Sequence, residues 1–217
     1  MMSSSKRVGK RLSERLKNLR KFHQKQQHIW DIGCDHGLLG MSFYGEAGIE
    51  SINLVDPSAP VIKELKINYK DSYITEGYLN IIHSEGQKLT IQKPSNTIFI
   101  AGMGGKEIGE IISHLLPQLD NSSQIIISPH RKILELRAQL KSMPLSLVTE
   151  EVIFEDEQFY QILVLKPGKG SAVSSFGQEM WRSEVGEQYR LQQLKTYEIH
   201  KDKASISYLE YLKTMVE

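Results

Sequence analysis

Two glycine-bearing turns carry most of the side chains in this chain that could bind a small ligand. The first, residues 31–37 with the sequence DIGCDHG, follows an apolar run and precedes a helix-like segment. The second, residues 101–105 with the sequence AGMGG, follows another apolar run. The first turn lacks the G-x-G-x-x-G spacing that places a dinucleotide pyrophosphate on a helix N-terminus, so it predicts a different ligand.

The acids of the first turn, Asp31 and Asp35, indicate the charge of that ligand. A carboxylate repels a pyrophosphate, whereas S-adenosylmethionine has no phosphate and carries a cationic sulfonium and a cationic amino group. The two turns together therefore predict an open α/β sheet whose strand ends bind S-adenosylmethionine.

Strand-like and helix-like segments alternate through the central part of the chain, which requires a parallel sheet covered by helices on both faces. On the helix that Ser58 caps, the pattern predicts that Val61, Leu65 and Tyr69 form the buried face. The predicted strands are 28–32, 51–56, 79–83, 97–101 and 124–128, and the predicted helices are 38–47, 58–69, 108–115 and 133–140.

The rhythm changes after residue 144. The apolar runs 145–154 and 159–165 are separated by only four polar residues, too few for a crossover helix, so they predict an antiparallel hairpin. A parallel sheet finished by such a hairpin is the Rossmann-like α/β architecture of class I methyltransferases. Residues 167–171 read as a linker, and two apolar stripes beyond it predict a helical hairpin. We expect a methyltransferase domain at 1–168, including a basic N-terminal helix, and a C-terminal helical hairpin at 169–217.

The formal net charge of +1 gives no global electrostatic case for nucleic-acid binding. The first 25 residues are nevertheless strongly basic and contain a single acid, Glu14. A solvated helix face and a polyanion-binding segment both fit this pattern. An apolar stripe through Val8, Leu12, Leu16 and Leu19 predicts that the helix docks on the domain. The basic residues are Lys6, Arg7, Lys10, Arg11, Arg15, Lys17, Arg20, Lys21 and Lys25.

The single cysteine, Cys34, cannot form an internal disulfide, which fits a reducing compartment, and we interpret it as a packed thiol rather than a nucleophile. No stretch approaches the roughly 20 apolar residues that span a bilayer, and no secretory signal is recognisable. We therefore expect a cytoplasmic protein with no membrane contact. The seven histidines show no metal-ligand spacing, so no metal is expected.

Three segments in this order and spacing resemble the bacterial tRNA (adenine-22-N1)-methyltransferases: 31–37, 101–105 and 154–160 (FEDEQFY). The resemblance runs along nearly the whole chain. It implies a Rossmann-like domain that binds S-adenosylmethionine and methylates N1 of one adenine in the D-arm region of tRNA, its expected partner. The chain departs from the family in having Ser128-Pro129-His130 where members usually have Gln-Pro-Asn, and residues 84–86 (SEG) where they have Gly-Asp-Gly.

Each expected cofactor contact has a purely structural alternative. Gly33 and Gly37 let the backbone approach the methionine portion of the cofactor, or simply form a tight turn. Asp56 ends the second strand, where an acid can accept both ribose hydroxyls, or can cap the next helix. Glu85 can accept from the adenine amino group, or be a solvated loop residue. The full expected set is Asp31, Gly33, Asp35, Gly37, Asp56, Glu85, Gly102, Met103, Gly104 and Gly105.

The expected catalytic set is His36, Ser128, Pro129 and His130. Methyl transfer from a sulfonium is an in-line displacement, so alignment supplies most of the acceleration, and adenine N1 already has a lone pair. A general base is therefore optional. His130 can stack on the adenine or orient it, or be a surface histidine at a helix start. His36 can bond within the turn or line the substrate entrance.

Two other functions fit the same pattern. One is methylation of a small molecule, since a fold does not determine its substrate, and the other is non-catalytic RNA binding on the same scaffold. The oligomeric state is not predicted, with a monomer favoured. If tRNA is the substrate, we expect the basic N-terminal helix and the C-terminal hairpin to contact its phosphates. The hairpin cations expected to do so are Arg182, Arg190, Lys195, Lys201 and Lys203.

Overall fold

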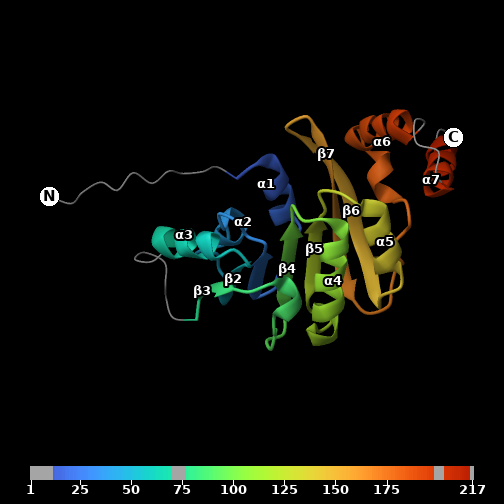
Figure 1. Ribbon diagram of the computed structural model, residues 1–217. Coiled ribbons are helices and arrows are strands. Elements are labelled where there is room, and N and C mark those ends of the chain that lie inside the picture. Colours follow the sequence, from blue (N-terminus) through green and yellow to red (C-terminus); the bar gives the residue numbers. More distant parts are fainter. Residues whose placement is uncertain (1–11, 70–76, 198–202, 216–217) are drawn as a thin grey trace.

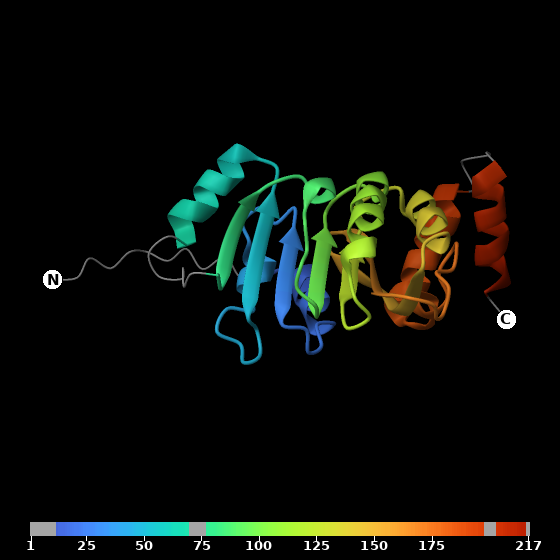
Figure 2. The same cartoon turned by 90° about the horizontal axis from the view of Figure 1, so that it is seen from below.

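The computed structural model describes residues 12–69, 77–197 and 203–215. Its seven strands form one twisted sheet in the order β3-β2-β1-β4-β5-β7-β6 (Figures 1 and 2). The first five strands pair in parallel, and β7 pairs antiparallel with both β5 and β6. The strands are β1 His28–Ile32, β2 Ser51–Asp56, β3 Leu79–His83, β4 Asn96–Ala101, β5 Gln124–Ser128, β6 Leu145–Glu155 and β7 Gln158–Pro167. The predicted fold class is confirmed.

Helices cover both faces of the sheet because neighbouring strand residues point to opposite sides. Ile98 and Ile100 of β4 pack with α4 and α5, whereas Phe99 packs with α1, α2 and α3. Figure 1 shows α3 beside the β3 edge and α6 and α7 at the far end of the molecule. The helices are α1 Glu14–Lys21, α2 Leu38–Met41, α3 Ala59–Tyr69, α4 Gly105–Leu115, α5 Ile133–Lys141, α6 Glu184–Tyr197 and α7 Lys203–Thr214, with short 3-10 turns at Gly86–Lys88, Leu116–Gln118 and Glu179–Arg182.

The hairpin between β6 and β7 closes with a two-residue turn. Asp156 and Glu157 both have positive φ angles, 48° and 61°, as a primed hairpin turn requires. Phe154 and Phe159 are paired across the hairpin, and their rings lie 4.7 Å apart. The predicted antiparallel hairpin is therefore confirmed.

The two C-terminal helices pack on β6 through a third apolar cluster that includes Val152, Trp181, Tyr189 and Tyr208. The domain boundary at residue 168 stays a prediction. The described part of the chain contains no helix that is long and apolar enough to cross a membrane.

A buried polar network joins this end of the sheet to the chain that follows it. The Arg137 side chain, fully buried, donates to Glu150 Oε2 at 2.6 Å and to Gln161 Oε1 at 2.8 and 3.1 Å. It also donates to the Ser174 carbonyl at 3.1 Å, and the other Glu150 oxygen accepts from the Glu179 N–H at 3.1 Å. Helix α5, the final hairpin and the approach to α6 are thus held by one guanidinium.

One of the local predictions was wrong. The helix expected at 38–47 is only four residues long, because turns follow in which Gly45 and Gly48 have φ angles of 78° and 91°. On α3 the predicted apolar face is confirmed, since the half-buried Val61 and Tyr69 pack against the same core cluster as the buried Leu65, which Ile62 also joins.

The N-terminal helix docks as predicted. Leu19 is fully buried, and the Ser13 side chain caps the helix by accepting from the Leu16 N–H at 3.3 Å. The more N-terminal basic residues, 6–11, lie outside the described residues.

Candidate functional site

The sheet topology brings the two predicted turns together. Strand order reverses between β1 and β4, and open α/β sheets bind their ligands in the crevice at such a switch point. The turn at 31–37 leaves β1 and the turn at 101–105 leaves β4, at the same edge of the sheet. A Cβ atom on Gly33 would lie 2.1 Å from Met103 Cε, so the turns are in contact.

Gly33 exposes its backbone at the centre of this crevice. Its φ angle of +71° favours glycine, and its N–H donates to the Val55 carbonyl at 2.8 Å, which holds the turn against β2. Any side chain at this position would be strained and would displace Met103. The lack of a Cβ at Gly33 therefore leaves room for the Met103 side chain between the two turns.

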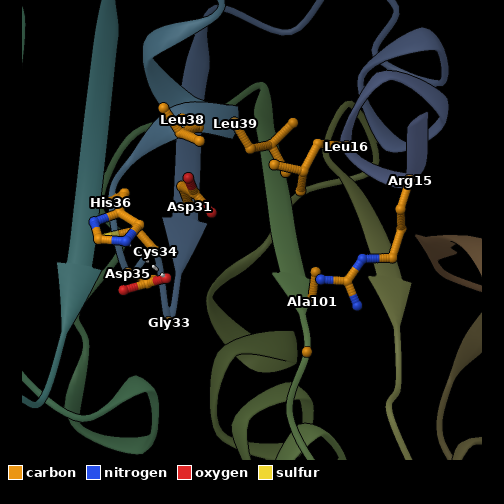
Figure 3. Close-up of a pocket in the computed structure, with 11 residues that line it drawn as sticks. Arg15, Leu16, Asp31, Gly33, Cys34, Asp35, His36, Leu38, Leu39 and Ala101 are labelled. Carbon is orange, nitrogen blue, oxygen red and sulfur yellow. Dashed lines mark ion pairs between the residues drawn. The ribbon is translucent and has the colours of Figure 1, made fainter. Parts of the chain in front are cut away.

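Two cavities meet at Gly33. The larger, of about 290 Å³, opens between α1 and the ends of β1 and β4 (Figure 3). The smaller, of about 130 Å³, lies toward β3 and α4. A ligand lying across Gly33 would reach into both. The larger cavity is lined by Arg15, Leu16, Asp31, Gly33, Cys34, Asp35, His36, Leu38, Leu39, Ala101 and Gly102. The smaller is lined by Ile32, Gly33, Pro57, Ser84, Glu85, Gly86, Gln87, Met103, Glu107 and Ile111.

Asp31 is the buried acid of the larger cavity. Its Oδ2 accepts from the Gly40 N–H at 2.8 Å, and no cation pairs with the carboxyl among the described residues. Burial raises the pKa of Asp31 to about 7, and the nearby Asp56 and Asp35 add to this effect against the Gly40 hydrogen bond. A cationic ligand would therefore favour the ionised form of Asp31.

Asp56 has a local structural role in the chain itself. Its Oδ1 accepts from the Ser58 N–H at 2.8 Å, in the turn that precedes α3, and its Oδ2 accepts from the Asp35 N–H at 3.2 Å. Each carboxylate oxygen retains a second lone pair, so ribose binding is compatible with these contacts and stays a prediction. Glu85 lines the smaller cavity, is exposed, and forms a 2.9 Å ion pair with Lys88.

His36 lies between two acids at the outer edge of the larger cavity. Its Nδ1 lies 3.3 Å from Glu64 Oε1, and its Nε2 lies 3.7 Å from Asp35 Oδ2 (Figure 3). The ring therefore lines the cavity and also contacts its own turn, so both proposed roles for His36 remain compatible with the structure.

Cys34 is buried beneath the same turn. Burial, together with Asp31 and Asp56, raises the pKa of the Cys34 thiol well above its usual range. The thiol stays protonated at neutral pH, in agreement with its interpretation as a packed residue.

The turns after β4 and β5 are bonded to each other. The Gly102 N–H donates to the Ser128 carbonyl at 3.0 Å, and the His130 N–H donates to the Met103 carbonyl at 2.9 Å. A Cβ on Gly105 would lie 2.3 Å from the Lys132 carbonyl oxygen, which gives this glycine a packing role. Gly104 is bridged to Arg131 in the same arrangement.

The four expected catalytic residues differ in accessibility. Ser128 and Pro129 are buried, and Ser128 Oγ has no hydrogen-bond partner among the described residues. His130 is exposed at the mouth of the site, with its ring 6.2 Å from that of Tyr160. Of the four, His36 and His130 could reach a substrate directly, whereas Ser128 and Pro129 shape the loop that presents His130.

Two site residues were not recognised from the sequence. Arg15, expected only as one of many basic residues, lines the larger cavity. Gly40 donates to Asp31, and a Cβ there would lie 2.5 Å from Leu54 Cδ2. Within 12–69, 77–197 and 203–215, no three His, Cys, Asp or Glu side chains cluster in a way that could hold a metal ion.

Residues 12–163 match the family described as "Methyltransferase domain". The chain belongs to this methyltransferase family. A curated relative, the tRNA (adenine(22)-N(1))-methyltransferase of Bacillus subtilis strain 168, is 24% identical over 166 residues, which cover 75% of this chain and 68% of the relative.

Solved structures show the same methyltransferase fold. A Streptococcus pneumoniae protein proposed to be a tRNA (m1A22) methyltransferase matches with a TM-score of 0.83 at 22% identity, over 95% of this chain and 100% of that one. The M. capricolum protein TrmK, solved with S-adenosyl-homocysteine, matches with a TM-score of 0.74 at 20% identity, over 94% of each chain. The resemblance to the bacterial tRNA (adenine-22-N1)-methyltransferases, which the sequence motifs indicated, is confirmed.

Proposed function

We propose that this methyltransferase transfers the methyl group of S-adenosylmethionine to N1 of an adenine in tRNA, at position 22 as in the named relatives. The observation that carries the proposal is the glycine turn at the switch point of the sheet, with one cavity on each side of Gly33. The larger cavity is lined by side chains of both charges, among them Arg15 and Asp31, and the smaller by apolar side chains beside Glu85, which suits a ligand with an amino-acid end and an adenosine end.

The residues at the turn fit S-adenosylmethionine. The open backbone at Gly33 accepts the middle of the ligand, where a Cβ would close the crevice. We assign Asp31 to the ammonium, Asp56 to the ribose hydroxyls and Glu85 to the adenine, since Asp31 lines the larger cavity and Glu85 and Met103 line the smaller. When bound, S-adenosylmethionine supplies a methyl group activated by its sulfonium.

The chain's own contribution to the reaction is alignment. The bonded turns after β4 and β5 hold Gly102 and His130 at one rim of the site, and Tyr160 lies beside His130. These groups can orient a flat base toward the methyl group, which in-line transfer requires. Because N1 lies on the Watson–Crick edge, a paired adenine must first leave its helix.

Contact with tRNA phosphates is proposed for the exposed cations Arg182 and Lys195 of the C-terminal hairpin and for Lys17 of α1. Arg190 was wrongly expected to join them. It is 5% exposed, and it donates to the Leu212 carbonyl at 2.9 Å and to Glu187 at 2.6 and 2.7 Å. Arg190 therefore clamps α6 to α7. Lys201 and the side chain of Lys203 lie outside the described residues.

Two further parts of the proposal concern organisation and location. We place the methyltransferase domain at 1–168 and the helical hairpin at 169–217, and the enzyme in the cytoplasm, where tRNA is modified.

Removing 170–217 would also remove Tyr189, whose hydroxyl accepts from the buried Gln161 at 3.2 Å, so truncation would disturb the sheet as well. Arg182→Gln with Lys195→Gln is a cleaner test of phosphate contact.

The function is tested by incubating the full chain with unmodified tRNA and S-adenosylmethionine and measuring nucleosides by mass spectrometry. The proposal expects 1-methyladenosine, absent when adenine 22 of that tRNA is replaced by guanine. The double variant Arg182→Gln with Lys195→Gln should lower the rate with tRNA at low salt, and its rate should depend less steeply on salt, because the variant makes fewer phosphate contacts. No methylated adenosine, or methylation that ignores the replacement, would refute the proposed substrate.

A further inference from the structure

One cationic side chain that lines the larger cavity, Arg15, has no ion-pair partner among the described residues. The Arg15 guanidinium has no hydrogen bond or ion pair with any described residue. By contrast, Arg20 on the same helix donates to Ser42 Oγ at 3.2 Å and pairs with Glu46. Lys21 pairs with Glu151 at 2.6 Å. An unpaired guanidinium that lines a cavity can bind an anionic group of a ligand.

Arg15 is held in place although its charge is unpaired. Its Cζ lies 4.7 Å from the centre of the Tyr160 ring, which is a cation–π contact. The backbone N–H of Arg15 donates to Glu155 Oε1 at 3.1 Å. The side chain reaches from α1 toward the end of β4 (Figure 3), where its Nη2 lies 3.8 Å from the position of a Cβ on Gly102. Helix α1 and the final hairpin thus aim it at the cavity.

The acids of the cavity lie on the opposite side. Asp31 and Asp35 flank Gly33 at the end of β1, and Figure 3 shows Arg15 facing them across the end of β4. A phosphate would meet these acids and be repelled. A group that carries an ammonium and a carboxylate on one carbon would satisfy both sides of the cavity.

We infer that Arg15 binds the α-carboxylate of the methionine portion of the cofactor, while Asp31 binds its α-ammonium. This inference rests on the proposed function and adds to it a second anchor for the same ligand. The planar guanidinium can donate two parallel hydrogen bonds to a carboxylate, which a lysine cannot reproduce.

The test compares three ligands by calorimetry on the full-length chain. S-adenosyl-homocysteine has the carboxylate, its decarboxylated analogue lacks only that group, and 5′-methylthioadenosine lacks the whole amino-acid end. The unaltered protein should bind S-adenosyl-homocysteine about 10- to 100-fold more tightly than the decarboxylated analogue. Equal affinity would overturn the inference without any variant being needed.

Arg15→Gln should abolish this preference and leave the affinity for 5′-methylthioadenosine unchanged. Arg15→Lys should recover only part of the preference, because it keeps the charge without the fork. Lys21→Gln is the matched control, since Lys21 is an exposed cation on the same helix that pairs with Glu151, and it should bind all three ligands like the unaltered chain.

Other outcomes have distinct meanings. If Arg15→Gln binds S-adenosyl-homocysteine normally but requires more tRNA for half-maximal rate, Arg15 serves the RNA and the inference is wrong. If the unaltered chain binds neither S-adenosyl-homocysteine nor 5′-methylthioadenosine, the proposed function fails and the inference fails with it. If 5′-methylthioadenosine binds and the carboxylate has no effect, only the inference fails.

Discussion

Asp31 and Glu150 are both buried carboxylates, and the chain treats them in opposite ways. Glu150 is fully partnered, by Arg137 on one oxygen and by the backbone N–H groups of Gln178 and Glu179 on the other. Asp31 receives one hydrogen bond, from Gly40, and lies near two other acids. The folded chain itself provides the hydrogen-bond donors and the cation for Glu150, whereas Asp31 in the Gly33 crevice can receive its cation from a ligand.

The same contrast holds for two arginines. Arg137 has no exposed surface and donates to Glu150, Gln161 and Ser174. Arg15 is half-buried, and among the described residues its guanidinium forms no hydrogen bond or ion pair beside the contact with Tyr160. We call the region around Arg137 and Glu150, whose charges are paired with each other, the structural end of the molecule. We call the crevice between Arg15 and Asp31, whose charges have no ion-pair partner among the described residues, its binding end. Substitutions at the two ends should separate stability from ligand affinity.

The largest effect is expected for Arg137→Met. The substitution leaves Glu150 buried without its cation, which should cost about 3–5 kcal/mol of unfolding free energy in urea titrations. The double variant Arg137→Met with Glu150→Gln should recover much of that loss. Any folded fraction should bind S-adenosyl-homocysteine normally. A single variant as stable as the unaltered chain would contradict the structural role of this pair.

A smaller effect is expected for Asp56→Asn, now on affinity. The amide loses charge-assisted bonds to the ribose, so binding of S-adenosyl-homocysteine should weaken by roughly 1.5–3 kcal/mol. Stability should also fall, by about 1 kcal/mol, because one of the bonds from Ser58 and Asp35 is lost. Reduced thermal stability with unchanged affinity would assign Asp56 to the turn alone.

Asp31→Asn should act in the opposite direction on the two properties. Removing an unpaired buried charge should stabilise the ligand-free chain by about 1 kcal/mol at pH 8, while its affinity for S-adenosyl-homocysteine falls about tenfold. Glu150→Gln is the matched control, since the same chemical change at the saturated carboxylate should destabilise the chain. Equal destabilisation by both substitutions would remove the contrast between the two ends.

The smallest effect is a pH dependence. In the folded chain the Asp31 carboxyl has a pKa raised from 3.8 to about 7, so the folded state binds more protons than the unfolded state between those values. The Asp31 contribution to stability is therefore fully present below pH 3.8 and is lost as pH rises toward 7.

Affinity for the cationic ligand should change the other way, rising as Asp31 ionises. Calorimetry and urea titration at pH 6.0 and 8.0, taken as roughly one pH unit on either side of the titration, would show the two opposed trends. Asp31→Asn should flatten both. Trends of the same sign, or trends unchanged by Asp31→Asn, would exclude Asp31 as their source.

Much of the binding end could be predicted from the sequence because its information is local. Apolar runs ending in glycine-bearing turns located β1, β4 and the Gly33 crevice, and four polar residues between two runs identified the β6–β7 hairpin. Helix α2 was overextended because glycines at 45 and 48 ended it in turns that apolar periodicity does not reveal.

Residues that depend on long-range partners could not be predicted. Arg137 lies within the helix predicted at 133–140, and its partners Glu150 and Gln161 come from two later strands. Arg15 was one of nine basic residues near the N-terminus, and only the docking of α1 beside Tyr160 shows that it faces the cavity. Arg190 looked like a surface cation for the same reason, although α7 buries it.

The central claim is that the crevice at Gly33 is the cofactor site, and binding of S-adenosyl-homocysteine to two glycine variants tests it most directly. Gly33 and Gly45 both have positive φ angles, +71° and +78°, so valine strains the backbone at either position. Only at Gly33 would the new side chain meet Met103, since a Cβ on Gly45 meets nothing within 4 Å. Calorimetry should show binding to the unaltered chain and to Gly45→Val, and none to a folded Gly33→Val. Equal binding to Gly33→Val would show that the ligand lies elsewhere and would contradict the account.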